Sequence, residues 1–331
     1  MSTHHIYQTV AEALASLGVD CAVPRALPEG NFLRVHAKGD KPGTKNLAFR
    51  RKGLIGYVQS WKTGKSALFR VNACDGYGVP AAAPTVSADE AAALATRLMH
   101  EAPLAMVSDY FARKGIDVSA FQLRQATATD LYHTFGYRCL GRSAATFVVV
   151  PAYRIVNGIP KLSTCQLIGG TPVKKHFLKG GAKKGTFWPV QPIAKTITAP
   201  VIGVAEGVAT AISVWQLFKE SAALTTVVAA FDCGNLLPVC QSLRKRWPKA
   251  SLIVFADNDC PDTDLTPNVC HLARNAGVTH ATAACRTVGA RLHAPSFDNA
   301  ARETFQLRFG KLPTDWNDFQ MIRGLYHHVT N

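Results

Sequence analysis

The sequence lacks the paired cysteines that build a zinc site. Its nine cysteines are scattered along 331 residues and none forms a C-x-x-C pair, so a zinc ribbon is excluded. Cys270 and His271 are adjacent rather than spaced as ligands, and we interpret them as packing residues. We therefore expect no zinc, and we expect the cysteines to be reduced thiols of a cytoplasmic protein.

Long apolar runs are also missing. No stretch approaches the length of a membrane span, and the first residues lack the layout of a signal peptide. Residues 63–66 (TGKS) resemble the end of a P-loop, but Gln59 stands where that motif needs its first glycine. These absences argue against a membrane protein and against an intrinsic NTP-driven helicase.

Acidic residues are scarce relative to basic ones. There are 22 Asp and Glu against 37 Lys and Arg, which gives a formal net charge of +15. Such an excess favours a polyanionic partner, because each phosphate that a cation neutralises releases counterions. A chain of this length can hold two or three domains.

Residues 198–283 alternate between short apolar stretches and amphipathic stretches with helical spacing. The apolar stretches predict four strands, at residues 201–204, 226–230, 252–256 and 278–283. The stretches between them predict three helices: one follows Gly207, one is capped by Asn235 and one ends at Gly277. Strands that alternate with helices indicate a parallel sheet with helices on its faces.

Carboxylates follow these strands. Glu206 comes directly after the first strand, and Asp257 and Asp259 come after the third. The carboxyl ends of parallel strands form the edge where open α/β sheets bind ligands. Side chains two positions apart on an extended chain point the same way, so Asp257 and Asp259 can share one ion. The site suits two or more Mg²⁺ or Mn²⁺ ions and phosphoryl transfer. We interpret Asp232, after the second strand, as a turn residue.

The order Glu-Gly, glycine-containing turn, Asp-Asn-Asp resembles the Toprim domain, which bacterial-type primases, topoisomerases, RecR proteins and OLD-type nucleases share. Three flanking segments are similar to those of phage and conjugative-plasmid primases: residues 108–124 (SDYFARKGIDVSAFQLR), 175–190 (KHFLKGGAKKGTFWPV) and 315–318 (DWND). The resemblance covers roughly residues 105–320 and implies that Glu206, Asp257 and Asp259 are catalytic and bind the metals. After Asp259 the chain reads CPDTDLTPN where relatives have an early glycine, which leaves the exact ligand set open.

The basic, glycine-rich turn is the second half of the predicted site. Lysines flank its glycines, and glycine lets a backbone approach phosphate closely. We expect these side chains to hold the incoming NTP or the template–primer duplex, with Arg138 as a further contact; they are Lys179, Lys183 and Lys184. The alternative is a plain solvated hairpin. Asp315 and Asp318 also have two interpretations, as ligands of a further metal or as the cap of a helix.

The first 78 residues interleave cations with aromatic side chains. A helix is predicted at residues 6–17, and short strands follow from Asn31. Cations can track a phosphate backbone while aromatic rings stack on bases, which predicts binding of the single-stranded DNA template. The candidate contacts are Arg50, Arg51, Tyr57, Trp61 and Lys62. The alternative is a small sheet with its aromatic rings turned inward.

These observations predict an α/β protein with a Toprim-type parallel sheet flanked by helices, a mixed α+β subdomain before it and a small α+β domain at the start. The expected divisions are a template-binding domain at residues 1–78, a Pro- and Ala-rich linker at 79–87, the subdomain at 88–197, the Toprim domain at 198–290 and an extension at 291–331.

The leading hypothesis for function is a DNA primase that uses metal ions and NTPs to make short oligonucleotide primers on single-stranded DNA. Such an enzyme would serve phage or plasmid replication or conjugation, beside a replicative helicase or another replication or conjugation protein. Two alternatives remain open. A Toprim nuclease would use the same carboxylates with water as the nucleophile, and a RecR-like adaptor would bind DNA without catalysis.

Overall fold

The computed structural model divides the chain into two compact units, Met1–Thr85 and Val86–Asn331. It describes residues 5–24, 27–30, 32–71, 86–137, 145–169, 173–194, 197–219, 224–258 and 275–327. Arg138, Asp259 and most of the predicted linker lie outside the described residues. Within these ranges no helix is long and apolar enough to cross a membrane.

The smaller unit is a five-stranded sheet with one helix. The strands lie in the order β1-β5-β4-β3-β2. Their bounds are β1 Ile6–Tyr7, β2 Leu33–Val35, β3 Leu47–Lys52, β4 Ile55–Ser60 and β5 Ser66–Arg70. Helix α1 (Val10–Ser16) begins at a capping box between Thr9 and Glu12. The predicted helix at residues 6–17 was therefore too long, because its first residues pair with β5 instead.

Helix α1 covers one face of this sheet. Leu14 of α1 and Leu17 at its C-cap pack on Phe49, Val58 and Phe69 in the core of the unit. Successive side chains of a strand point to opposite faces, so the residues between these core positions form a second face. We call that second face the open face.

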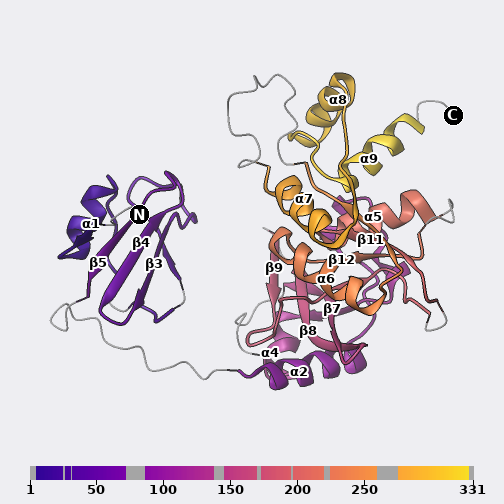
Figure 1. Ribbon diagram of the computed structural model, residues 1–331, viewed down its shortest axis with the longest axis horizontal. Coiled ribbons are helices and arrows are strands. Elements are labelled where there is room, and N and C mark those ends of the chain that lie inside the picture. Colours follow the sequence, from indigo (N-terminus) through magenta and orange to yellow (C-terminus); the bar gives the residue numbers. More distant parts are fainter. Residues whose placement is uncertain are drawn as a thin grey trace. The chain divides into compact units, whose positions relative to one another are not determined.

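The larger unit contains two sheets. The first is antiparallel, in the order β6-β7-β8-β9. Its strands are β6 Arg124–Thr127, β7 Thr146–Val156, β8 Ile159–Gly169 and β9 Lys174–Phe177. Helices α2 (Ala88–Glu101) and α4 (Ala128–His133) pack on one of its faces, at the bottom of the unit in Figure 1. Helix α2 begins at a capping box between Ser87 and Glu90.

The second sheet has the order β10-β12-β11-β13-β14, and every pair except β10–β12 is parallel. Its strands are β10 Trp188–Pro189, β11 Val201–Ala205, β12 Thr226–Ala229, β13 Ser251–Phe255 and β14 Arg291–His293. The predicted parallel sheet is present. One predicted strand is wrong, because residues 278–283 lie in helix α7 (Ala276–Val288) and β14 is the fourth parallel strand.

The sequence of α7 explains this correction. Ala281, Ala284 and Cys285 recur at helical spacing and are buried, whereas a strand would bury alternate residues. The side chain of Asn275 accepts a hydrogen bond from the Val278 N–H and caps the helix. Gly277 therefore lies in the first turn of a helix rather than at the end of one.

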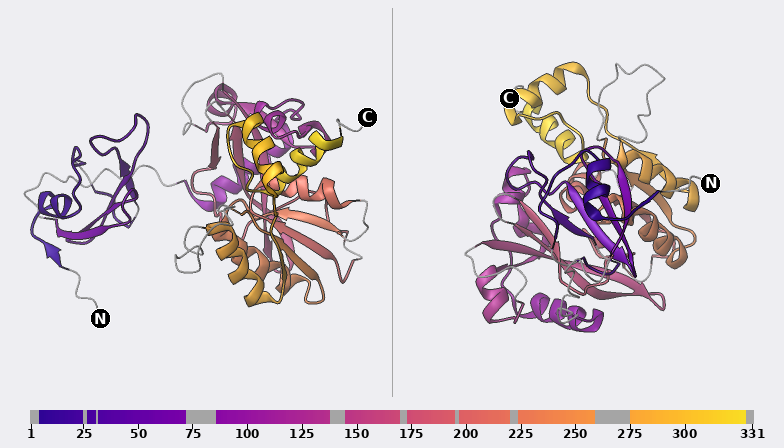
Figure 2. Two further views of the ribbon diagram at one scale, coloured as in Figure 1. Left: turned by 90° about the horizontal axis from the view of Figure 1, so that it is seen from above. Right: turned by 90° about the vertical axis from the view of Figure 1, so that its left-hand side faces the viewer.

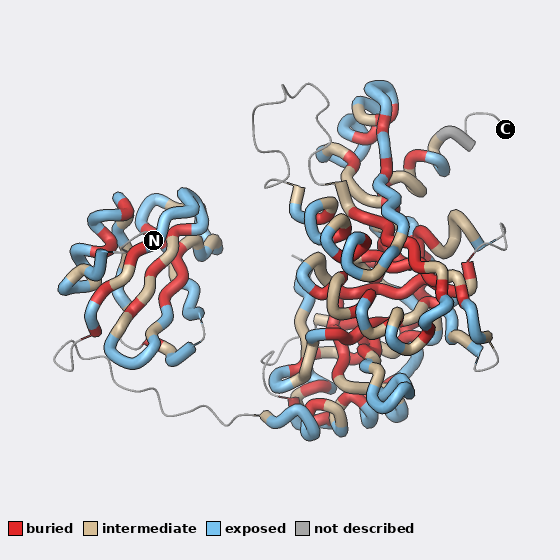
Figure 3. Tube along the Cα trace, viewed as in Figure 1, coloured by how far each residue is buried: buried red, intermediate tan, exposed pale blue. Residues whose placement is uncertain are grey.

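The helices cover both faces of the parallel sheet. Helix α5 (Val208–Phe218) packs on one face, in a core that also includes α3 (Asp109–Arg113) and residues of the antiparallel sheet. Helices α6 (Leu236–Arg246) and α7 pack on the other face. The buried residues accordingly concentrate along the strands in Figure 3. Helices α8 (Asn299–Phe309) and α9 (Trp316–His327) pack together at one end of the unit (Figures 1 and 2).

Candidate active site and nucleic-acid surface

The predicted carboxylates follow neighbouring strands of the parallel sheet, and the helices after these strands lie on opposite faces of the sheet. Strand β11 lies between β12 and β13. The helix after β11 leaves on one face, and the helices after β12 and β13 lie on the other face. In open α/β sheets, ligands bind in the crevice that such a switch creates beyond the carboxyl ends of the strands. Glu206 is the first residue after β11 and lies at this point.

Asp257 belongs to the same edge. Ala205 of β11 pairs with Phe255 of β13, so Glu206 and Asp257 follow neighbouring strands that are about 4.8 Å apart. Both residues are half-buried. The structure thus brings two of the three predicted carboxylates to one edge of the sheet. Among the described residues no group of three His, Cys, Asp or Glu side chains could hold a metal ion, and the third predicted carboxylate, Asp259, lies outside them.

The backbone around Asp257 is tightly packed. A Cβ atom added to Gly277 would lie 2.4 Å from the Asp257 carbonyl oxygen, so only glycine fits this first turn of α7. The next residue, Asn258, donates its N–H to the Thr314 carbonyl at 2.7 Å and accepts a hydrogen bond from the Asn275 side chain at 2.7 Å. These contacts fix the end of β13 against α7 and against the segment before α9.

The basic turn reaches the same edge. Lys183 forms an ion pair with Asp232, which follows β12, and its ammonium nitrogen lies 5.3 Å from the centre of the Phe177 ring. Burial lowers the pKa of Lys183 below its usual value, although the neighbouring Cys233 and Glu206 act to raise it. Glu206 is therefore close enough to act on this lysine electrostatically. Lys179 and Lys184 are exposed and remain available to solvent.

Asn235 holds the turn in place. Its side-chain oxygen accepts the Gly185 N–H at 2.7 Å, and its amide nitrogen donates to the carbonyls of Thr186 at 2.8 Å and Ala230 at 2.7 Å. Asn235 stands at the N-cap position of α6, as predicted, but its side chain makes no capping hydrogen bond, because this buried amide is committed to the turn. Asp232 instead accepts the Asn235 N–H at 2.9 Å, in agreement with its interpretation as a turn residue.

The glycines of the turn serve packing. A Cβ atom on Gly180 would lie 2.1 Å from the Val86 carbonyl oxygen, and one on Gly181 would lie 2.2 Å from the Thr164 hydroxyl. That glycine lets this backbone approach a phosphate stays a prediction. The structure shows that these two glycines let the turn approach the rest of the protein.

A strained residue adjoins the turn. Phe231, two residues after the end of β12, has a φ of 72°, a left-handed conformation that costs energy for a bulky side chain. Its ring packs edge-to-face on Phe177 with the ring centres 5.1 Å apart. Backbone strain of this kind concentrates at functional sites.

Two of the segments that resemble primases meet in the structure. The ammonium group of Lys114 lies 3.5 Å from Asp315 and 3.8 Å from Asp318. Lys311 also binds Asp318, with its nitrogen 2.7 Å from one carboxylate oxygen, and the Asp318 side chain is 1% exposed. Burial alone would lower the pKa of Lys114, but the two aspartates outweigh it and the pKa is raised. These four residues form a lysine–aspartate cluster.

The same aspartates shape the start of α9. Asp315 accepts the Asp318 N–H at 2.7 Å, so it caps the helix, which is one of its two predicted interpretations. The intervening Asn317 is fully buried and donates to the Lys114 carbonyl at 2.7 Å and to the Ser213 hydroxyl at 2.9 Å. A metal at Asp315 and Asp318 would have to compete with the two lysines.

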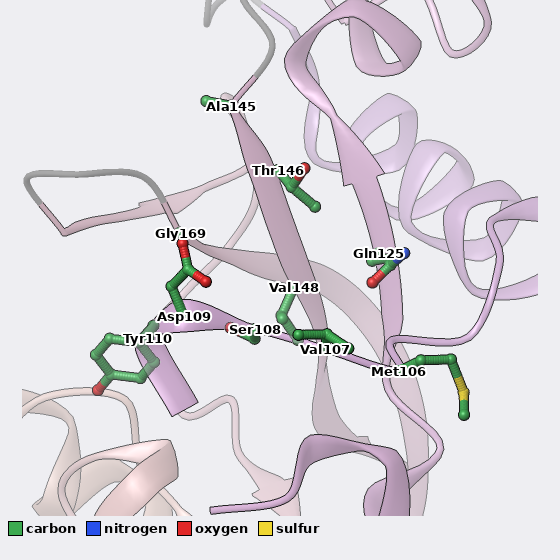
Figure 4. Close-up of a pocket in the computed structure, with 10 residues that line it drawn as sticks. All are labelled: Met106, Val107, Ser108, Asp109, Tyr110, Gln125, Ala145, Thr146, Val148 and Gly169. Atoms are coloured by element: carbon green, nitrogen blue, oxygen red, sulfur yellow. The ribbon is translucent and has the colours of Figure 1, made fainter. Parts of the chain in front are cut away.

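A hollow lies beside the start of α3. It has a volume of about 470 Å³ and combines apolar side chains with hydroxyl, amide and carboxylate groups. Figure 4 shows Asp109 and Tyr110 on one side of it and Gln125 and Met106 on the other. The first residues of α3 therefore border this hollow. Lys114, which belongs to the lysine–aspartate cluster, directly follows the last residue of α3.

The open face of the smaller unit carries cations stacked on aromatic rings. The Arg34 guanidinium lies 4.6 Å from the centre of the Trp61 ring. The Arg50 guanidinium lies 4.7 Å from the Phe32 ring and 5.1 Å from the Tyr57 ring. The strand register places Lys52 and Arg70 on the same face, and no Asp or Glu of the described strands lies there.

The structure separates the predicted contacts of this unit into two groups. Arg50, Tyr57 and Trp61 lie on the open face, and Trp61 is 51% exposed. Arg51 points the other way, donates to the Leu27 and Gly53 carbonyls and pairs with Glu29, so it holds loops together. Lys62 pairs with Asp40 at 3.8 Å.

Two curated proteins similar to this chain are each named DNA primase TraC and come from Escherichia coli. One is 28% identical in an alignment of 315 residues that covers 87% of this chain and 26% of the relative. The other is 33% identical over 123 residues, which is 37% of this chain and 8% of the relative. The chain is similar to DNA primase TraC. It spans about a quarter or less of the length of these relatives. No known protein-family model matches the chain.

One solved structure also matches. It is described as bacteriophage T7 lagging-strand DNA polymerase interacting with primase domains of two gp4 subunits bound to an RNA/DNA hybrid and dTTP. The matched chain is 14% identical to this one, and the match covers 60% of this chain and 85% of that chain with a TM-score of 0.36. A TM-score of this size does not establish a shared fold.

Sequence reasoning missed the part that three residues play at these sites. The sequence around Asn235 indicated only a helix cap and Phe32 gave no signal, because their partners are distant in sequence or depend on strand register. Lys114 lies within the segment that resembles primases, and its cationic position before Gly115 could have suggested a carboxylate partner.

Proposed function

We propose that this chain is a DNA primase that makes short oligonucleotides on single-stranded DNA. The similarity to DNA primase TraC over 87% of the chain carries this proposal. The geometry supports it independently, because two carboxylates and a cationic turn meet at the edge of a parallel sheet where ligands bind. The Toprim resemblance of the Glu206 and Asp257 segments is part of the proposal.

The proposed active site is the edge that carries Glu206 and Asp257, completed by Asp259. These carboxylates would hold Mg²⁺ or Mn²⁺, as the oxygen-rich set at adjoining strand ends favours. Such ions, when bound, neutralise the triphosphate and stabilise charge on the attacking and leaving oxygens. The reaction joins the 3′-oxygen of one nucleotide to the α-phosphate of the next and releases pyrophosphate.

The turn of Lys183 would position the triphosphate. Lys183 is held over the edge by Asp232 and Phe177, and Asn235 fixes the backbone that carries it. A fixed cation costs little further entropy when it meets a phosphate, which favours binding in one orientation. Exposed Lys179 and Lys184 would add charge along the path of the nucleic acid.

The open face of the smaller unit is proposed to bind the single-stranded template. Its arginines and exposed rings offer the combination that stacks bases and follows a phosphate backbone without a fixed sequence. Of the predicted contacts, Arg50, Tyr57 and Trp61 are proposed to touch the template, together with Arg34. Arg51 and Lys62 are proposed to support the fold of the unit.

One assay tests the primase proposal against its two alternatives. The full chain is incubated with single-stranded DNA, Mg²⁺ or Mn²⁺ and labelled NTPs, and the products are separated by size. New labelled oligonucleotides support a primase. Shortened template with no synthesis would identify a nuclease, and a shifted template band with neither product would identify a DNA-binding adaptor. Either of these outcomes overturns the proposal.

A further inference from the structure

The larger unit carries another cationic surface besides the basic turn. It is a groove of about 920 Å³ between the end of α3, the end of α5, the end of α8 and the outer part of α9. Arg113, Arg308 and Arg323 line it, one from each of α3, α8 and α9, together with apolar Leu217 and Phe309. We call it the arginine groove.

The charges of this groove are not neutralised. Arg113, Arg308 and Arg323 are exposed, and none forms an ion pair with a carboxylate within the described residues. The groove has no acidic residue in its lining. Its fourth cation, Lys114, is already paired with the aspartates of the lysine–aspartate cluster. Three like charges converging on one concave surface raise its positive potential and attract a polyanion.

The residue types favour a nucleic acid as that polyanion. Guanidinium groups form paired hydrogen bonds with phosphate oxygens. The arginines lie on three separate elements, which suits successive phosphates of a strand better than a single anion. Phe309, 37% exposed beside Arg308, offers a ring on which a base can stack.

The groove also lies on a path from the proposed active edge. The Asn258 N–H binds the Thr314 carbonyl, so the segment that begins α9 adjoins the end of β13. Arg323 lies farther along the same helix, about 10 Å from its start at Trp316 at 1.5 Å per residue. We propose that the arginine groove binds the backbone of a nucleic-acid strand, as a contact separate from the open face and the basic turn.

The test compares two variants of the full chain that lose the same charge. The groove variant is R113A/R308A/R323A. The control is R154A/K249A/R286A, which removes three exposed cations from β7, the loop before β13 and α7. Anisotropy of a labelled dT20 oligonucleotide, over a series of salt concentrations without metal or NTP, gives the affinity and its salt dependence.

The groove variant should lose affinity, and its slope of log affinity against log salt should fall by about 2, because each lost contact to a single strand removes about 0.7. The control should keep most of the salt slope of wild type. The variant R113K/R308K/R323K, which retains the three charges, should have a slope close to that of wild type. If the salt slope of dT20 binding fell equally in the groove variant and in the control, or fell in neither, the proposal would be overturned. Thermal unfolding checks that each variant is folded.

An acidic protein is the other polyanion that could bind here. Competition with a peptide of glutamates distinguishes the two, because the proposal predicts that the peptide binds wild type and groove variant equally weakly. Loss of peptide binding in the groove variant with unchanged dT20 binding would assign the groove to a protein and reject the proposal. The assay contains no NTP, so failure of the primase proposal would leave its result unaffected.

Discussion

At the scale of single residues, the edge of the parallel sheet is defined by groups that cannot be exchanged. Gly277 must lack a Cβ because of the Asp257 carbonyl, and Asn235 must offer both a donor and an acceptor. Such residues fix the position of Asp257 and Lys183 without taking part in chemistry. We therefore expect that substitution of Gly277 or Asn235 would displace Asp257 or Lys183 from its position in the site.

The carboxylates themselves give the most direct prediction. Asp257→Ala and Asp259→Ala should each lower oligonucleotide synthesis by more than about 100-fold, since even residues that only support metal ligands contribute 10- to 100-fold. The fold and the affinity for DNA should stay close to those of wild type. Synthesis is measured with labelled NTPs, and Asp117→Ala, at an exposed turn, is the control. Wild-type rates in both variants would reject the proposed site.

The lysine–aspartate cluster makes stability depend on pH. The pKa of Lys114 is raised above its usual value of 10.5, so its charged form stabilises the folded state below pH 10.5. This contribution is lost as the pH rises through the folded-state pKa. Lys114→Met should reduce the free energy of unfolding by about 1–3 kcal/mol at pH 7, less than for a fully buried pair because Lys311 remains.

Urea unfolding at pH 7, 9 and 11 measures this effect. The difference in the free energy of unfolding between wild type and Lys114→Met should be smaller at pH 11 than at pH 7. The variant Lys249→Met, at an exposed position, should have the stability of wild type at all three pH values. A difference that stays constant with pH would show that packing, rather than charge, explains the role of Lys114.

Cysteine chemistry gives a third prediction at this scale. Burial raises the pKa of Cys240 to about 12 and raises that of Cys165 as well, so neither forms the reactive thiolate at neutral pH. Both should resist alkylation by iodoacetamide at pH 7.5 in the folded protein and react fully in 6 M guanidinium. Mass spectrometry of the labelled peptides measures this, and rapid labelling of Cys165 in the folded chain would contradict its burial.

At the scale of secondary-structure elements, the open face tests the role of the smaller unit. Trp61→Ala and Tyr57→Ala should each weaken binding of single-stranded DNA by about 1–3 kcal/mol with little change in salt dependence, because stacking releases no counterions. Arg50→Ala should weaken binding and also reduce the salt slope. Arg51→Ala should instead destabilise the unit, since it binds two loop carbonyls.

Anisotropy and thermal unfolding separate these outcomes. If Arg51→Ala weakened DNA binding as much as Arg50→Ala at unchanged stability, the two faces of the sheet would have been assigned the wrong way round.

The elements also show what sequence can and cannot predict. Strands β11, β12 and β13 of the parallel sheet and the helix after Gly207 followed from local spacing and composition. Residues 278–283 were predicted as a strand because Val278 and Thr279 favour strands locally, but the buried positions of α7 follow a helical period.

Contacts between distant parts of the chain were beyond such reasoning. Arg50 and Arg51 are adjacent in sequence, and only the strand register shows that they lie on opposite faces. The pairing of Lys114 with Asp315 joins positions 201 residues apart. Sequence spacing relates residues that are neighbours along one helix or strand. It therefore predicted which strands the carboxylates follow, and it did not predict the residues that contact them.

At the scale of the whole molecule, the division into two units predicts a division of labour. Deleting residues 1–78 should leave a folded protein that still binds NTP in the presence of Mg²⁺ but primes poorly on single-stranded DNA. The salt slope of DNA binding should shrink as contacts are lost. Anisotropy, nucleotide binding and the synthesis assay measure these three properties. An unchanged DNA affinity and slope would exclude the smaller unit as the template-binding element.

The bonds of Asn235 also constrain the order in which the protein folds. They connect the basic turn to residues 49 and 50 positions away, and contacts of such separation form only after a large loop has closed. The turn cannot dock until β12 and the start of α6 are in place. A refolding chain should therefore complete its parallel sheet first and recover catalytic competence later, so that the return of activity lags behind the return of secondary structure.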